Sequence, residues 1–206
     1  MNVLLGFDPG GDRRFGWCVC EDVEDLPLTV REAGCSGTVD DAIASASYQI
    51  RDGEHPIGVG IDAPMFWVRS TGRRVDREVR SAVRQAGAPY PPGTVQHVNS
   101  LRGACVAQGM LIAADLRELY PNLVVSECHP KALLWIIGNG GGAGALAAYV
   151  RGVEGRTEHE RDAAIGCLSA WAAVRRPVGW RDLAILDHER YSPVAPVTYW
   201  MPQWEV

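Results

Sequence analysis

Short apolar runs and helix-like repeats alternate along the first part of the chain. Residues 3–7, 15–20 and 28–35 form three runs of strand length, and turn-forming residues such as Gly, Pro and Asp separate them. We expect these strands to form an antiparallel meander, because short connections join neighbouring antiparallel strands.

A helix and a fourth strand follow the meander. Thr38 and Asp41 make a capping-box-like start, and apolar residues then recur at helical spacing to about residue 51. Residues 57–61 are short and apolar, which predicts a buried strand. A right-handed strand–helix–strand unit places its two strands parallel, so the first and fourth strands should end at the same edge of the sheet.

The rest of the chain predicts further helices and one more strand. Helical patterns cover residues 73–85 and 98–119, residues 123–126 have strand character, and a capping box at Thr157 begins a helix that runs to about residue 175. The Gly-rich segment 138–144 lacks the Gly-Lys-Ser/Thr ending of a phosphate-binding loop and is interpreted as a connector.

Composition indicates a single folded domain and narrows its partners. The chain has 206 residues, of which 47% are hydrophobic, enough for one domain with a real core. We expect one domain over residues 1–206, with a core in about residues 1–176 and a Trp- and Pro-containing extension over residues 177–206. The net charge of -5 disfavours nonspecific binding to nucleic acid, so such binding needs a local basic patch.

The cysteines and the apolar runs indicate a cytoplasmic protein. The six cysteines form no CxxC pair and no zinc-ribbon spacing, so they are interpreted as small buried residues in a reducing compartment. The N-terminus has no signal-peptide pattern, and no apolar run is long enough to span a bilayer. No membrane partner is expected.

Acidic residues follow three of the predicted strands. Asp8, Asp62 and Glu127 each stand directly after a strand, and Asp162 lies on the Ala- and Ile-rich face of the last helix. If they converge, two carboxylates about 4 Å apart repel by about 4 kcal/mol at an intermediate dielectric, so they need a cation to stay ionised. Carboxylates bind Mg²⁺ or Mn²⁺, and two such ions can activate water and stabilise the leaving oxygen of a phosphodiester.

Each of these residues also has a purely structural interpretation. Asp8 and Asp62 precede turn-forming residues, so either could simply shape a turn. Glu127 and His129 could cap or brace the helix that follows them. His159, in the first turn of the last helix, either orients a ligand or a water or is a surface residue of the helix start.

A stripe of arginines follows Asp62 in the sequence. The stripe recurs at three- and four-residue spacing and consists of Arg69, Arg73, Arg77, Arg80 and Arg84. It is interpreted either as a contact surface for a phosphate backbone or as a solvated helix face that neighbouring acids partly neutralise. The C-terminal tryptophans could stack on bases, but packing over the core or in a homodimer contact is the preferred interpretation.

Two sets of motifs carry a family resemblance. The first strand with its Asp-Pro-Gly end and following Gly-Trp, the strand that ends at Asp62, and the helix with His159-x-x-Asp162 resemble the RNase H-like superfamily, with an opening motif close to that of RuvC-type resolvases. More specifically, the chain resembles the "domain of unknown function 429" (DUF429) family of predicted RNase H-like nucleases in the segments IDAP, RRVDREVR, SECHPKA and HERDAAIGCLSAW.

The resemblance implies an α/β fold of three layers, with a mixed five-stranded sheet, an N-terminal antiparallel meander and helices on both faces. It also implies a metal site at the C-terminal rim of the sheet. The implied metal ligands are Asp8, Asp62 and Asp162, and we assign the fourth acid, which comes from different elements in different members, to Glu127.

The residues and the resemblance together predict a metal-dependent nuclease that hydrolyses phosphodiester bonds of nucleic acid with Mg²⁺ or Mn²⁺, using two ions. The four acids are the expected catalytic residues and metal ligands. The alternatives are an actin-like nucleotide-binding phosphotransferase, which normally needs two such domains, and a non-catalytic binding or assembly module. The expected substrate-binding residues are Arg73, Arg74, Arg77, Arg80, His129 and His159.

Overall fold

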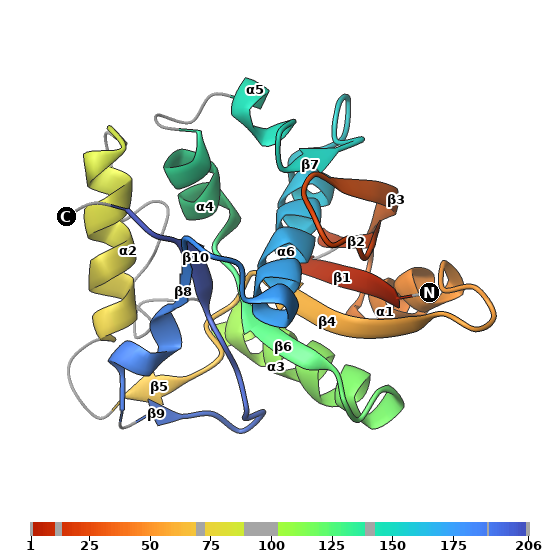
Figure 1. Cartoon of the computed structure of the whole chain (residues 1–206). Helices are drawn as coiled ribbons and strands as arrows, with labels where there is room; N and C mark the ends of the chain where they lie inside the picture. Colours follow the sequence, from red (N-terminus) through yellow and green to blue (C-terminus); the bar gives the residue numbers. More distant parts are fainter. Residues whose placement is uncertain are drawn as a thin grey trace.

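The protein is built around a six-stranded mixed sheet (Figure 1). The computed structural model describes residues 2–10, 14–68, 73–88, 103–138, 143–188 and 190–204. The strands of the sheet lie in the order β6-β4-β1-β2-β3-β7. Their bounds are β1 Asn2–Pro9, β2 Phe15–Glu21, β3 Leu28–Ser36, β4 His55–Ile61, β6 Val124–Glu127 and β7 Val150–Arg151.

The strand directions confirm the expected arrangement. β1, β2 and β3 form an antiparallel meander, and β4 and β6 lie parallel to β1 on its other side. These five strands have the mixed directions of the five-stranded sheet that the resemblance implies. β7 is a sixth strand that was not predicted. It pairs parallel with the start of β3 over only two residues, a length too short for an apolar pattern to reveal.

Helices cover both faces of the sheet, as expected. α6 (Glu158–Arg175) packs against β1, β2 and β4 on one face, whereas α1 (Val39–Tyr48) and α3 (Gly103–Leu119) pack on the other (Figure 1). Alternate residues of β1 therefore enter different cores: Leu4 lies on the α6 side, and Leu5 lies on the side of α1 and α3. Within the described ranges, no helix is long and apolar enough to cross a membrane.

Capping residues set the helix starts much as predicted. Thr38 caps α1 by accepting from the backbone nitrogen of Asp41 at 3.1 Å, and a complete capping box begins α6 at Thr157. α1 ends at Tyr48, three residues before the predicted end. Residues 98–102 of the predicted long helix and residues 139–142 of the predicted connector lie outside the described residues, as does Arg69.

No side chain separates α6 from the middle of the sheet. A Cβ atom at Gly6 of β1 would collide with the backbone oxygen of Ala163, and a Cβ atom at Gly60 of β4 would collide with that of Gly166. Glycine is needed at these two positions because the helix backbone lies directly on the strand backbone. This close approach sets the position of every α6 side chain relative to the strand ends.

The C-terminal residues cover the edge of β6. The backbone nitrogen of Thr198 donates to Val125 at 3.0 Å, and its oxygen accepts from the nitrogen of Glu127 at 2.9 Å. Covering this edge removes exposed strand hydrogen-bonding groups. The remaining elements are β5 Trp67–Val68, α2 Arg74–Gln85, α4 Pro130–Ile137, α5 Ala143–Leu146, β8 Trp180–Asp182, the 3₁₀ helix η3 Leu183–Leu186, β9 Arg190–Tyr191 and β10 Trp200–Pro202.

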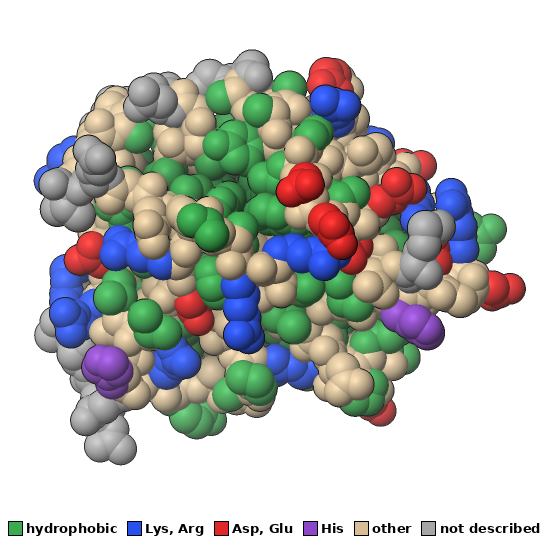
Figure 2. All heavy atoms as spheres, in the orientation of Figure 1, with side chains coloured by type: hydrophobic (Ala, Val, Ile, Leu, Met, Phe, Trp, Pro, Cys, Tyr) green, Lys and Arg blue, Asp and Glu red, His purple; other side chains and the backbone are tan. Residues whose placement is uncertain are grey.

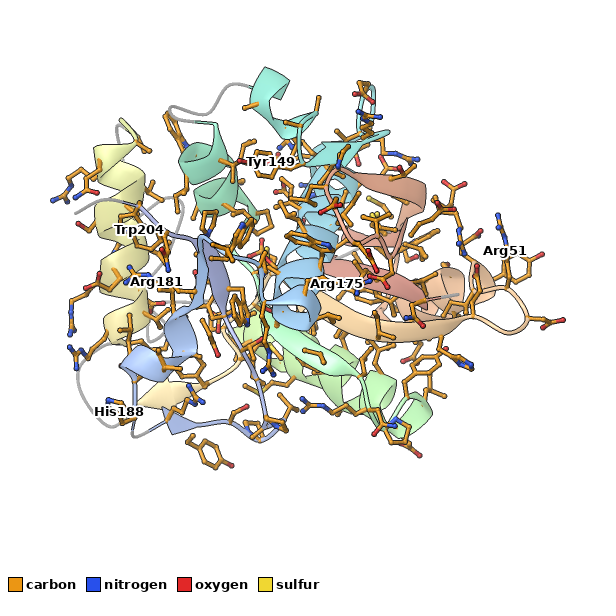
Figure 3. All side chains as sticks on the ribbon, viewed as in Figure 1. Arg51, Tyr149, Arg175, Arg181, His188 and Trp204 are labelled. Carbon is orange, nitrogen blue, oxygen red and sulfur yellow. The ribbon has the colours of Figure 1, made fainter. Side chains whose placement is uncertain are left out.

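Three tryptophans of the C-terminal segment pack on the core of the α6 side. Trp180, Trp200 and Trp204 are partly buried there, which confirms the packing interpretation of these residues. Trp180 meets Trp171 edge to face, with ring centroids 6.1 Å apart. Arg181 lies over the ring of Trp204 at 4.6 Å (Figure 3).

We predict that Gly6→Ala lowers the free energy of unfolding by about 1–3 kcal/mol, because the added methyl group must push α6 away from β1. Gly37→Ala is the matched control: the nearest atom to its added Cβ would be a carboxylate oxygen of Asp41 at 3.8 Å. The control should change stability by less than about 0.5 kcal/mol. Urea denaturation measures both, and equal stability of the two variants would contradict the backbone contact.

Candidate metal centre

Two aspartates lie at the same end of neighbouring parallel strands. Asp8 is near the end of β1 and Asp62 directly follows β4, and the nitrogen of Asp62 donates to the oxygen of Phe7 at 2.9 Å. Phe7 and Ile61 enter the core of the α1 and α3 side, so the alternation of strand residues turns both aspartates to the α6 side. Asp8 is 8% exposed, and the side chain of Asp62 is 29% exposed.

Helix α6 brings a third aspartate and a histidine to this edge. Asp162 is 3% exposed, and His159 stands one turn earlier on the same face of the helix. Nδ1 of His159 lies 2.7 Å from Oδ2 of Asp8, a hydrogen bond that joins α6 to β1. Three separate elements thus supply the three aspartates of the rim.

The three aspartates share an unfavourable electrostatic environment. Burial, followed by repulsion from Asp8 and Asp162, raises the pKa of Asp62 to about 8. Burial and repulsion from Asp8 raise the pKa of Asp162 to about 6. Burial also raises the pKa of Asp8, although the hydrogen bond from His159 opposes the shift. The ionised form of this group therefore gains from additional positive charge.

Two basic residues stand beside the aspartates without cancelling their charge. Nη2 of Arg161 lies 3.4 Å from Asp162, and Nζ of Lys131 forms a 2.8 Å ion pair with Glu158. The charge of Lys131 lowers the pKa of all three aspartates, but the pKa of each remains raised. Lys131 was not among the predicted site residues. Its signals in the sequence are that it is the chain's one lysine and that it lies in the SECHPKA segment.

Glu127 lies in a separate ion-pair network. It pairs with Ile61 in the strand register. Because successive strand residues alternate between the faces of the sheet, the side chains of Glu127 and Asp62 lie on opposite faces. The next residue, Cys128, is the one that packs against α6. Although burial opposes it, attraction to Arg73 together with the hydrogen bond to His129 lowers the pKa of Glu127 to about 2.

The predicted basic stripe divides between the interior and the surface. Arg73 is 1% exposed and contacts both Asp76 and Glu127, each at 2.6 Å. Arg74 and Arg77 are exposed on α2, and Arg80 is half-buried. Asp76, an acid of α2 that an exposed helix face would present to solvent, is instead 1% exposed. The Arg73-x-x-Asp76 spacing was the available signal for this pair.

Carboxylate oxygens are the donors that Mg²⁺ and Mn²⁺ prefer, and the raised pKa values of the rim aspartates fit such an ion. The described residues contain two groups of three potential ligand atoms within 4.8 Å, and the rim aspartates are not one of them. One ion in direct contact with all three aspartates therefore requires a side-chain rotation. One group is Asp76, Glu127 and His129, where Arg73 supplies the positive charge. The other group consists of the buried free thiols of Cys18, Cys20 and Cys167.

The raised pKa values predict how stability depends on pH. The folded protein holds the protons of Asp62 and Asp162 more tightly than the unfolded chain, so their contribution to stability is complete below about pH 4 and is lost as pH rises to about 8. In EDTA, the melting temperature should fall over this range, and Asp62→Asn should flatten the upper part of the fall. Asp52→Asn, at an exposed turn, is the control. An unchanged slope in Asp62→Asn would contradict the assignment.

Comparisons with known proteins identify the family of the chain but not its activity. The Thermus thermophilus RuvC structure aligns with 84% of this chain and 95% of its own, at 16% sequence identity and a TM-score of 0.43. A likeness this distant carries no conclusion about activity. No curated protein matches the chain. The family described as "Protein of unknown function (DUF429)" matches residues 6–163, which is most of the chain, and the protein belongs to this family.

Proposed function

We propose that this protein is a Mg²⁺- or Mn²⁺-dependent nuclease that hydrolyses phosphodiester bonds of nucleic acid. The observation that supports this function best is the set of three aspartates at one rim, whose burial and mutual repulsion raise the pKa of Asp62 to about 8 and that of Asp162 to about 6. A divalent cation would relieve that repulsion and keep all three ionised near neutral pH.

In this proposal the three rim aspartates, His159 and Glu127 have different tasks. Bound divalent ions would activate water and stabilise negative charge on the departing oxygen. Asp8, Asp62 and Asp162 hold the ions, and His159 fixes the orientation of Asp8 through the 2.7 Å hydrogen bond. Both oxygens of Glu127 already accept from Arg73, so Glu127 supports the site instead of binding an ion directly.

The proposed substrate surface combines α2 with the start of α4. Arg74 and Arg77 are exposed on α2, and Figure 2 shows basic side chains on the side of the molecule that α2 forms. Lys131, at the start of α4, has a side chain that is 54% exposed beside the aspartates. Because the net charge of the chain is -5, a nucleic-acid backbone must contact such local cations.

Titration with Mn²⁺ tests the metal site. The melting temperature of the wild type should rise with Mn²⁺ concentration, because an ion that binds the folded state alone stabilises it by mass action. Asp8→Asn and Asp162→Asn should lose this rise and lose cleavage across a panel of RNA, DNA and hybrid substrates. Asp52→Asn should keep both. A wild type that Mn²⁺ does not stabilise would refute the proposal, and stabilisation by nucleotide alone would favour a phosphotransferase.

Substitution of Lys131 tests the substrate surface. With a substrate that the wild type cleaves, Lys131→Met should raise KM and reduce the slope of log KM against log salt by about 1, because one phosphate contact is lost. Stabilisation by Mn²⁺ should remain. Arg51→Met removes an exposed positive charge close to the start of β4, at the far end of that strand from the rim (Figure 3). Equal effects of the two substitutions on KM would exclude a specific contact at Lys131.

A further inference from the structure

A buried set of charged groups links the start of α2 to the end of β6. Arg73 is 1% exposed, and its guanidinium forms two parallel hydrogen bonds with Glu127, from Nη1 at 2.8 Å and from Nη2 at 2.6 Å. The same guanidinium also bonds Asp76, with Nη2 2.6 Å from Oδ1. The fork geometry of arginine fixes the plane of the Glu127 carboxylate in a way that a single-point contact would not.

Further contacts hold the two charges in place. The backbone nitrogen of Met65 donates to Oε2 of Glu127 at 2.9 Å. The guanidinium donates to the backbone oxygen of Phe66 at 3.3 Å and lies 4.6 Å from the centre of its ring. Met65 and Phe66 belong to the segment that leaves the rim after Asp62, so the ion pair is tied to the chain next to the candidate metal centre.

His129 lies between this ion pair and the rim. Its Nε2 is 3.1 Å from Oε1 of Glu127, and its Nδ1 is 3.9 Å from Oδ1 of Asp62. The ring of Tyr199 packs against the imidazole, with centroids 5.5 Å apart. His129 is 7% exposed, so the orientation of its imidazole is set by these neighbours and not by solvent.

We infer that Arg73 and Glu127 position His129, and through it the carboxylate of Asp62, for the binding of a divalent cation at the rim. The inference rests on the proposed metal site. Arg73, Glu127 and His129 are positioning residues, because they act on the cation only through Asp62. Asp62 is the most exposed of the three rim aspartates, so it has the most side-chain freedom to lose when a cation binds. A fixed neighbour reduces that loss.

The binding constant for Mn²⁺, measured by isothermal titration calorimetry, tests the inference without relying on catalysis. Glu127→Gln should weaken Mn²⁺ binding about ten- to a hundredfold, the usual effect of removing a group that orients a metal ligand. Arg73→Lys, which keeps the charge but loses the fork, should weaken binding less. His129→Gln should resemble Glu127→Gln, because it removes the ring that faces Asp62.

A second, partly buried arginine–glutamate pair provides the matched control. Arg31 forms the same two-pronged contact with Glu54, at 2.6 Å and 2.9 Å, at the far end of the sheet next to the start of β4. Glu54→Gln should destabilise the fold without changing the Mn²⁺ binding constant. Equal weakening by Glu54→Gln and Glu127→Gln would overturn the inference, because the effect would then follow from destabilisation.

The remaining outcomes separate the inference from the proposed function. A wild type that binds Mn²⁺ while His129→Gln and Arg73→Lys bind it equally well would overturn the positioning role and leave the nuclease standing. A wild type that binds no Mn²⁺ would overturn both. His129→Gln and Arg73→Lys keep the test decisive if Glu127→Gln does not fold.

Discussion

The direct contact between the backbone of α6 and the backbones of β1 and β4 is the constraint on which the rest of the structure depends. Gly6 and Gly60 leave room for it, and any larger side chain would lift the helix from the sheet. Because the helix lies so close, the side chains of Asp162 and His159 reach the ends of the strands. A longer separation would leave Asp8 without its histidine partner.

The rim and the neighbouring network deal with negative charge in opposite ways. Glu127 is ionised and satisfied, with both oxygens bound by one guanidinium, and such a group gains little from a further cation. Asp62 and Asp162 are held close to other carboxylates, and burial adds to the cost of ionising them. This contrast, more than the number of acids, distinguishes candidate ligands from structural carboxylates in this fold.

Local patterns predicted every strand of the sheet except β7, and most of the helices, because alternation, helical spacing and capping residues are properties of short segments. The shared edge of Asp8 and Asp62 also followed from the handedness rule for parallel strands. The separation of Glu127 from these residues did not, since it depends on pairing with Ile61 in the register, and a shift of one residue would reverse it. Likewise, an arginine stripe at helical spacing reads the same whether Arg73 points inward or outward.

The order of synthesis gives the C-terminal segment a late role in folding. Asp187 accepts hydrogen bonds from the backbone nitrogens of Arg74 and Val75, at 2.9 Å and 3.0 Å, and so caps α2 from a position more than a hundred residues later in the chain. Until the ribosome has released that part, the first turn of α2 lacks its acceptor, and the edge of β6 lacks Thr198. The start of α2 and the outer edge of β6 are therefore completed only when Asp187 and Thr198 dock.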